Sequence, residues 1–143
     1  MTAAISFPAA QQHHATRSLR GYLAEVACLL GIGLESCVID HDRPVSAYLA
    51  LDIRLPQYPD RDVALLWDEC RGWSIAIETH SGEDLIVLRY LGGSTPVPGP
   101  RRVARFVEAM RAGDHRPGRP DPVSLREAGD LDDLAALLAR PRS

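Results

Sequence analysis

Two apolar runs flank an acidic pair and an Arg-Gly dipeptide in LLWDECRGWSIAIET, residues Leu65–Thr79. A three-residue turn that ends at Gly72, with this glycine in the left-handed conformation, pairs Glu69 with Trp73. Residues of a strand point alternately to its two faces, so the register can be judged by how it sorts the side chains. The stretch predicts a β-hairpin.

The predicted register separates the side chains of this hairpin by polarity. The pairs are Trp67 with Ile75 and Leu65 with Ile77 on one face, and Leu66 with Ala76 and Asp68 with Ser74 on the other. Cross-strand pairs of this kind stabilise a sheet by about 0.2–1 kcal/mol each. We therefore interpret Trp67 and Trp73 as packing residues of a sheet and not as catalytic groups.

Neighbouring segments extend the hairpin into an antiparallel meander. Upstream, SCVID is typical of a short strand, HDRP of a turn, and VSAYLALDI alternates with the period of two that belongs to a half-buried strand. Downstream, a Ser-Gly pair predicts a tight turn into LIVLRYL, with Ile77 opposite Ile86 and Ile75 opposite Leu88. We expect four or five strands.

Two amphipathic helices flank the meander. After Thr16, a suitable N-cap, apolar residues recur every three or four positions until Gly31 provides a helix stop. A second helix begins at Pro100, because proline is favoured at the first helical position, and ends at Gly113. Its apolar stripe consists of Val103, Phe106, Val107 and Met110. The predicted fold class is α+β, with this C-terminal helix packed on the sheet.

The chain divides into three predicted parts. Residues 1–15 form a disordered N-terminal tail, residues 16–112 an α+β domain, and residues 113–143 a Pro/Arg-rich tether with a short amphipathic helix. Ser124 with Glu127 indicates a capping box in this mobile tail, whose helix has the apolar stripe Leu131, Leu134, Ala135 and Leu138. Both sheet faces carry apolar residues, so one helical layer leaves a face open. A homodimer through the second face, or the tail helix, would cover it.

Composition excludes several classes of protein. The longest run free of charged and polar residues, Ala27–Leu34, is far shorter than the roughly 18 residues of a membrane span. The first fifteen residues lack the layout of a secretory signal, so we expect a cytoplasmic protein. Three cysteines without a CxxC pair argue against a disulfide framework. All 16 basic residues are arginine, which excludes lysine-dependent chemistry.

An ordered set of motifs runs from about Arg20 to Met110: RGYLAEVACLLGI, AYLALDIRLPQYPDRD, LLWDECRGWSIAIET, GED, YLGG and VARFVEAM. In this order they resemble a family of small uncharacterised actinobacterial proteins with a domain of unknown function. The resemblance implies no activity, cofactor or catalytic residue. It agrees with the GC-rich source that the absence of lysine and asparagine indicates.

Few residues suit catalysis or metal binding. Asp68 and Glu78 share a face in the predicted register and are candidate ligand-site carboxylates for acid/base work, although acids that solvate the end of a hairpin explain them equally. The predicted hairpin places no histidine or nucleophile beside this pair to complete a catalytic site. Asp40, His41 and Asp42 point to opposite faces of an extended chain and cannot hold one ion together. We predict no catalytic residue, no cofactor and no metal.

An arginine cluster carries the strongest functional signal. Residues 101–119 hold six arginines against two acidic residues, in a chain whose net charge is −3. Arg101 and Arg102 lie in the first helical turn, where the helix dipole disfavours positive charge, and Arg105 follows Arg101 by one turn. Such a local violation can mark a surface that binds carboxylate or phosphate. An ordinary solvated helix face is the alternative.

We therefore expect a non-enzymatic protein-interaction or regulatory module whose partner is another protein or a second copy, with no membrane contact. Its acidic tail helix can also fold back on the basic helix. One alternative is a small-ligand-binding protein or enzyme that uses carboxylates near the 68–78 hairpin. Another is nucleic-acid binding through Arg101–Arg119, which a pI near 5.9 disfavours. The candidate partner-binding residues are Arg101, Arg102, Arg105, Leu131, Leu134 and Leu138.

Overall fold

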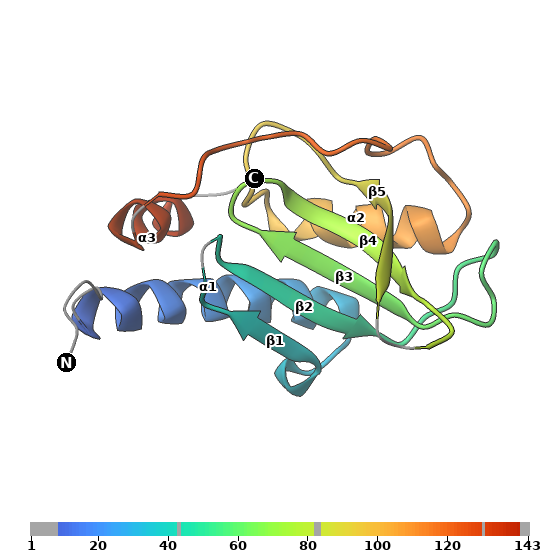
Figure 1. Cartoon of the computed structure of the whole chain (residues 1–143), viewed down its shortest axis with the longest axis horizontal. Helices are drawn as coiled ribbons and strands as arrows, with labels where there is room; N and C mark the ends of the chain where they lie inside the picture. Colours follow the sequence, from blue (N-terminus) through green and yellow to red (C-terminus); the bar gives the residue numbers. More distant parts are fainter. Residues whose placement is uncertain (1–8, 43, 82–83, 130, 141–143) are drawn as a thin grey trace.

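Five strands form one antiparallel sheet in the order β1-β2-β3-β4-β5, so each strand pairs with its neighbours in sequence (Figure 1). The computed structural model describes residues 9–42, 44–81, 84–129 and 131–140. Helices α1 and α2 cover one face of the sheet, and α3 lies beside α1. The elements are α1 (Ala9–Leu30), the 3-10 turn η1 (Leu34–Ser36), β1 (Cys37–Asp40), β2 (Ser46–Leu51), β3 (Val63–Asp68), β4 (Gly72–Glu78), β5 (Leu85–Tyr90), α2 (Pro100–Arg111) and α3 (Leu131–Ala139).

The α+β class and the five-stranded meander are confirmed. The β1–β2 hairpin forms as predicted, although its HDRP turn includes Arg43, which lies outside the described residues. Helix α2 begins at Pro100, and the glycine that ends it, Gly113, has a φ of 81°. The predicted apolar stripe of α2 is the buried one: Val103, Phe106, Val107 and Met110.

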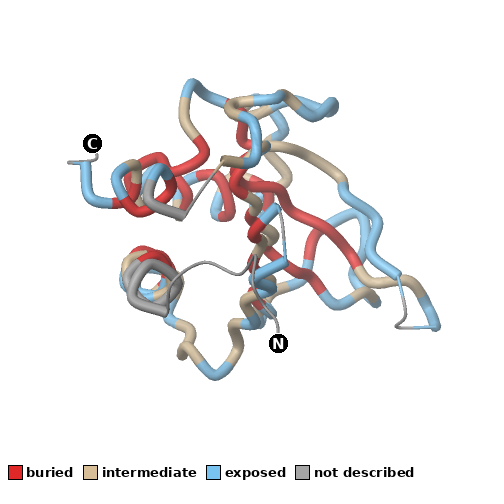
Figure 2. The backbone as a smooth tube through the Cα atoms, turned by 60° about the vertical axis from the view of Figure 1, so that its left-hand side comes forward, coloured by how far each residue is buried: buried red, intermediate tan, exposed pale blue. Residues whose placement is uncertain are grey.

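The hydrophobic core lies between the sheet and the two helices. Alternate residues of the central strands point into it, and Leu65 and Ile75 are 0% exposed. Figure 2 shows the burial of the central strands and the exposure of several connecting segments. We call this covered side the inner face and the opposite side the outer face.

The β3–β4 register differs from the prediction by two residues. Trp67 pairs with Trp73 and Asp68 with Gly72, whose φ is 74°, so the turn consists of residues 69–71. The turn begins one residue earlier than predicted because a carboxylate oxygen of Asp68 accepts hydrogen bonds from two backbone amides of the turn. The donors are the amides of Cys70 and Arg71, each at 2.7 Å. A shift of two preserves the face of every side chain, so the predicted faces are correct.

A β-bulge changes part of the β4–β5 register. Ile77 pairs with Ile86 as predicted, but the bulge puts Arg89 instead of Leu88 opposite Ile75. The extra residue places the Arg89 guanidinium against the tether, where it donates to the carbonyl oxygens of Pro117 and Gly118. The predicted Ser-Gly turn before β5 includes residue 82, which lies outside the described residues.

Helix α1 begins earlier than the sequence pattern indicates. It starts at Ala9, seven residues before the predicted N-cap Thr16, and therefore includes part of the segment predicted to be disordered. Residues 9–12 are Ala-Ala-Gln-Gln, all good helix formers, which explains the extension without an apolar stripe. Residues 1–8 lie outside the described residues.

The C-terminal tail differs from the prediction in two respects. Ser124 and Glu127 form no capping box, because α3 begins at Leu131; the backbone amides of Leu125 and Arg126 instead donate to the carbonyl of Cys70, at 2.7 and 3.3 Å. The acidic α3 packs on α1 and not on the basic α2. Burial of its apolar stripe decides the position, since exposed charge pairs contribute little.

Candidate functional site

The two tryptophans at the β3–β4 turn belong to the core. Each is 1% exposed. The indole nitrogen of Trp67 donates to the carbonyl of Pro96 at 2.6 Å, and that of Trp73 donates to the Tyr22 hydroxyl at 3.0 Å. Tyr22 in turn donates to the carbonyl of Pro98. Trp67 and Trp73 therefore position the segment that leads into α2, as packing residues.

Glu69 joins the turn to the tail, a role that the sequence did not reveal. Its side chain is 2% exposed and accepts hydrogen bonds from the backbone amide of Val45 at 2.7 Å and from the guanidinium of Arg126 at 3.0 Å. The amide of Gly129 approaches the same carboxylate at 3.4 Å. A buried carboxylate that pairs with the partly buried Arg126 is a structural anchor, and both of its oxygens accept hydrogen bonds.

Asp68 and Glu78 share the outer face, as predicted, but the structure does not bring them together. Asp68 lies at the start of the turn, whereas Glu78 is six residues along β4 from Gly72, roughly 20 Å at the usual rise of a strand. Glu78 accepts a hydrogen bond from the hydroxyl of Tyr48 at 2.7 Å. The two carboxylates therefore do not form an acid/base pair.

Tyr48 has the largest upward pKa shift on the outer face. Burial of the hydroxyl, followed by its hydrogen bond to Glu78 and the charge of that carboxylate, raises the pKa of Tyr48 to about 12. A tyrosine that resists deprotonation is a poor nucleophile and a poor base at neutral pH. Within the described residues, no group of three histidine, cysteine, aspartate or glutamate side chains is placed to hold a metal ion.

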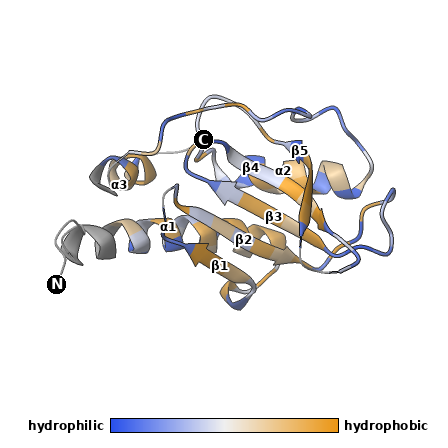
Figure 3. Cartoon of the chain, in the orientation of Figure 1, coloured by the Kyte–Doolittle hydropathy of each residue, from blue (hydrophilic) through white to orange (hydrophobic). Residues whose placement is uncertain are grey.

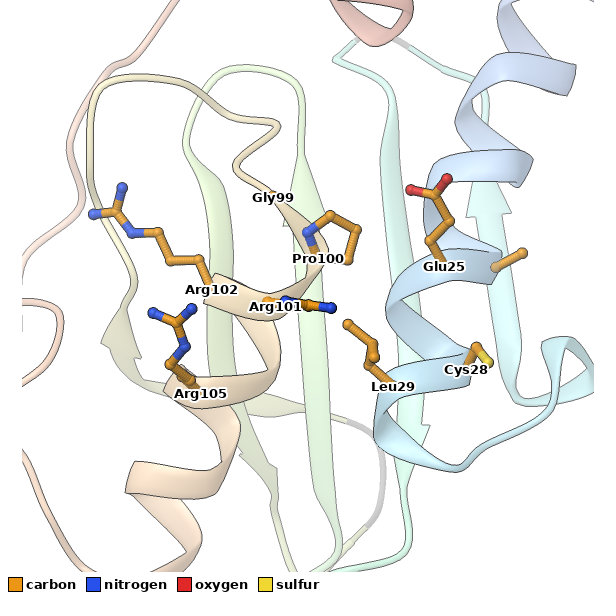
Figure 4. A pocket seen from close by; sticks show the side chains of 9 residues that line it. Glu25, Cys28, Leu29, Gly99, Pro100, Arg101, Arg102 and Arg105 are labelled. Carbon is orange, nitrogen blue, oxygen red and sulfur yellow. The ribbon is translucent and has the colours of Figure 1, made fainter. Parts of the chain in front are cut away.

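The arginine cluster lines a groove between α1 and the first turn of α2 (Figure 4). The groove has a volume of about 1010 Å³, and α1 contributes Ala24, Glu25, Cys28 and Leu29 to it. From α2 come Pro100 and the predicted residues Arg101, Arg102 and Arg105. The structure thus gathers all three predicted arginines around one concave surface, which is the candidate functional site.

The geometry of α2 directs these arginines outwards. Val103 and Phe106 anchor the helix in the core, so the arginine positions face solvent, and all three are exposed. Figure 4 shows Arg101 extending towards Leu29 of α1, while the other two arginines lie on the opposite side of the first turn. Arg102 also approaches Gly93, where an added Cβ would lie 3.2 Å from its guanidinium.

The first turn of α2 accumulates positive charge without compensation. Among the hydrogen bonds and ion pairs of the described residues, none involves the side chain of Arg101, Arg102 or Arg105. Gly99, the N-cap, provides no side-chain cap, and no acidic residue lies in the first turn. The amides of Arg102 and Val103 donate to the carbonyl of Gly99. The arginines repel one another and the positive end of the helix dipole, whereas an anion bound there would be stabilised by the guanidinium groups and by the dipole.

The α1 side of the groove was not predicted from the sequence. Leu29 is 49% exposed although it is a large apolar residue of a helix, and Cys28 beside it is also exposed. The sequence does contain one indication of this apolar surface, because Leu29 lies outside the apolar stripe of the helix, which contains Leu23, Val26 and Leu30. Only the fold shows that this off-stripe leucine faces the start of α2.

The leucines of the tail lie apart from this groove. Leu134 and Leu138 are 1% and 4% exposed and pack with α3 against α1. The side chain of Leu131 lies outside the described part of the structure. The described members of the predicted partner-binding set therefore separate into exposed arginines on α2 and two leucines, Leu134 and Leu138, that are buried within the chain.

The model of a family of unknown function, DUF6292, matches residues 22–109. The match includes the sheet, nearly all of α2 and every residue that lines the groove, and it excludes α3. No curated protein and no solved structure matches the chain. None of the helices in the described residues has the length and apolar character needed to span a membrane.

Proposed function

We propose a function for this chain, which belongs to the family of unknown function DUF6292: it is a non-enzymatic interaction module whose groove between α1 and α2 binds an acidic segment of a partner protein. The observation that carries the proposal is the excess positive charge of one concave surface, where Arg101, Arg102 and Arg105 stand against a single acidic residue, Glu25. Guanidinium groups form charge-assisted, often bidentate, hydrogen bonds with carboxylates.

The apolar part of the groove favours a protein segment over a free anion. Ala24, Leu29 and Pro100 offer apolar surface to side chains, while the arginines surround it with charge. A helix that alternates leucine with acidic residues presents both kinds of group at the spacing of a groove-binding peptide. Aliphatic contacts would then supply affinity, and the arginines would supply orientation and selectivity.

Nucleic-acid binding through Arg101–Arg119 receives less support. Arg111 and Arg116 pair with Glu108 and Asp114, so part of the basic segment is neutralised locally. The chain as a whole has a net charge of −3 and offers no extended basic field to a polyanion. A small-ligand or enzymatic role for Asp68 and Glu78 has the weakest support, because the two are distant and hydrogen-bonded within the fold.

We also propose a cytoplasmic protein from an actinobacterium. The three free thiols, Cys28, Cys37 and Cys70, suit a reducing compartment. The absence of lysine and asparagine, together with the motif resemblance, supports the source.

Binding of a designed peptide tests the proposed function. The probe is a fluorescein-labelled amphipathic helix with leucine at helical spacing and glutamate elsewhere, and its matched control has glutamine in place of glutamate. We expect fluorescence anisotropy to show tighter binding of the glutamate peptide, and the double variant Arg101→Gln/Arg105→Gln to weaken it by about tenfold. Equal affinity of the two peptides, or no effect of the double variant, would refute the proposal.

Two pairs of variants distinguish binding in the groove from nonspecific electrostatic attraction. Arg111→Gln, which removes one charge from the same helix outside the groove, should leave binding unchanged, whereas Arg101→Gln alone should weaken it. Leu29→Ser removes an apolar contact and should also weaken binding, whereas Val38→Ser on the outer face should not. A random DNA duplex of about 30 base pairs that binds more tightly than the peptide would favour the nucleic-acid alternative instead.

A further inference from the structure

The outer face of the sheet contains a hollow that none of the described helices covers (Figure 1). Its volume is about 430 Å³, within the range of small-molecule pockets, which is roughly 300–1,000 Å³. The strands β1, β2 and β3 that form much of its floor are largely hydrophobic in sequence (Figure 3). Charged side chains nevertheless line the end of the hollow next to the β3–β4 turn: Asp40, Asp68 and Arg71.

The register of the strands places two carboxylates on either side of one serine. The row of outer-face residues nearest the turn runs from Asp40 on β1 through Ser46 on β2 to Asp68 on β3. Asp40 and Asp68 therefore lie two strands apart, with about 10 Å between their Cα atoms at the usual spacing of strands. Carboxylates that lean inwards over Ser46 can both contact one small cationic group.

Each of these carboxylates keeps an oxygen that the fold does not use. The Oδ1 atom of Asp68 accepts hydrogen bonds from two amides of the turn, and the Oδ1 atom of Asp40 accepts one from the amide of Asp42. In the described part of the chain, no hydrogen bond or ion pair involves either Oδ2 atom. Both Oδ2 atoms are therefore available to a ligand.

A buried hydroxyl group lines the same hollow from the next row of the outer face. This row consists of Val38, Tyr48, Leu66 and Ser74. Ser74 is only 6% exposed, yet its hydroxyl makes no hydrogen bond with any described residue. Buried hydroxyl groups normally have a partner. Ser74 is the diagonal neighbour of Asp68 on the adjacent strand, roughly 7–8 Å away, so one ligand can contact both.

We propose that this hollow binds a small primary amine that carries an apolar body. An ammonium group has three N–H donors, which match the three free acceptors Asp40, Asp68 and Ser74. The apolar body would lie over Leu66 and the ring of Tyr48, whose face also attracts a cation. The acceptors therefore select the ammonium group, and the second row selects what it is attached to.

The sign of the charge in the hollow favours a cation over an anion. Arg71 is exposed at its rim, but its single guanidinium stands against the two carboxylates of Asp40 and Asp68, so an excess of negative charge remains. The hollow is separate from the groove between α1 and α2, which lie on the inner face. Glu78 has no part in it, because that carboxylate lies at the other end of β4 and accepts the Tyr48 hydroxyl.

Titration of the isotope-labelled full chain with phenethylamine, followed by NMR, tests the proposal. The amide signals of Ser46 and Ser74 should shift more than those of α2, with a dissociation constant of about 1 mM or tighter. The N,N,N-trimethyl derivative has the same charge but no N–H donor and should bind about tenfold more weakly. Phenylpropionate, which has a carboxylate in place of the ammonium group, should not bind measurably.

Isosteric variants remove charge without removing the turns. Asp40→Asn and Asp68→Asn keep the Oδ1 atom that accepts the backbone amides, and each should weaken phenethylamine binding by about tenfold. Ser74→Ala should weaken it by a smaller factor, because it removes a neutral acceptor. Arg71→Gln should strengthen binding, because it removes the opposing charge. Asp52→Asn is the control, since this exposed acid lies beyond the other end of β2, and it should have no effect.

Several outcomes would overturn the proposal. They are no binding of phenethylamine at about 10 mM, equal binding of its trimethyl derivative, no effect of either asparagine variant, and signal changes confined to the groove between α1 and α2. A homodimer that buries Val38 and excludes the amine would assign the hollow to a second copy instead. Binding of an acidic peptide in the groove has no bearing on these outcomes, because the two sites share no residue.

Discussion

The two faces of the sheet follow the same alternating pattern but are protected in different ways. On the inner face, large side chains such as Leu65 and Trp73 fill the space beneath α1 and α2. On the outer face, the central positions of β3 and β4 are alanines, Ala64 and Ala76, each 0% exposed although none of the described helices lies above them. The outer face therefore excludes water from its centre without a second layer.

The side chain of Tyr48 explains how water is excluded from the centre of the outer face. It lies on β2, but its hydroxyl reaches the carboxylate of Glu78 on β4, so the two side chains together must cross β3. A ring can lie flat across the middle strand only where the residue beneath it is small, as Ala64 is. Binary patterning alone cannot distinguish a face covered by helices from one covered by its own side chains, because both are apolar at every second position.

Substitution of two neighbouring leucines tests whether the two faces are packed differently. Leu65 and Leu66 are neighbours on β3 that point to opposite faces, and only Leu65 is fully buried. Leu65→Ala should lower the free energy of unfolding by about 2–5 kcal/mol, because it leaves a cavity under the helices. Leu66→Ala should lower it by about 1 kcal/mol, because water or its neighbours can fill the space.

Urea unfolding followed by tryptophan fluorescence measures both changes. The measurement is made at low protein concentration, so that any association of the chain does not add to the stability of either variant. Equal losses for the two leucines would mean that the outer face is packed as tightly as the inner one. The distinction between a covered and an open face would then be wrong.

A second prediction concerns the edge of the inner face, where the tail closes over the β3–β4 turn. Glu69→Gln removes the charge that pairs with Arg126, whose side chain is only 14% exposed. We expect a loss of about 2 kcal/mol, less than for a fully buried pair because Arg126 keeps access to water and its contact with Asp133. Hydrogen exchange should show α3 opening before the sheet.

Asp114→Asn is the control for this prediction. It breaks the ion pair with Arg116, which is exposed and belongs to the same tail, and it should change neither the stability nor the exchange of α3 measurably. If Glu69→Gln left the protection of α3 intact, the contact of α3 with α1 would be sufficient by itself, and Glu69 would not be the anchor of the tail.

Much of this fold could be predicted from the sequence because it depends on local periodicity. The faces of β3 and β4 and the stripe of α2 follow from spacings of two and of three to four residues. The β3–β4 register could not be predicted, because Asp68 closes the turn through its side chain and Glu69 leaves the ladder to bond with Val45 and Arg126. The sequence does not show that Glu69 and Arg126, 57 positions apart, are partners.

The candidate site illustrates the same limit. The arginines of α2 could be predicted because they violate a local rule about charge at a helix start. Their apolar partner Leu29 lies on another helix, and only the packing of α1 beside α2 brings the two together. The opposite charges of the two segments predicted that the tail helix packs on the basic α2, but α3 packs its apolar stripe against α1. The charge pattern picked out arginines that are exposed in the structure, but it did not indicate where the tail helix packs.

The smallest expected effect is on the outer face, in the titration of Tyr48. Its pKa of about 12 lies above the ordinary value of 10.0 because burial and Glu78 favour the neutral hydroxyl. The folded chain therefore holds this proton more tightly than the unfolded chain. The resulting stability is complete below pH 10.0 and is lost as the pH rises towards about 12. Tyr48→Phe should remove this part of the pH dependence.

The chemical shift of the labelled tyrosine ring carbon that bears the hydroxyl, followed by NMR from neutral to alkaline pH, measures the effect directly. Glu78→Gln removes the carboxylate charge but keeps a hydrogen-bond acceptor, so the pKa of Tyr48 should move part of the way back to its ordinary value. Burial is the larger cause and should keep the remainder of the shift. A Tyr48 that titrates near its ordinary value in the wild-type chain would mean that the ring does not lie across Ala64.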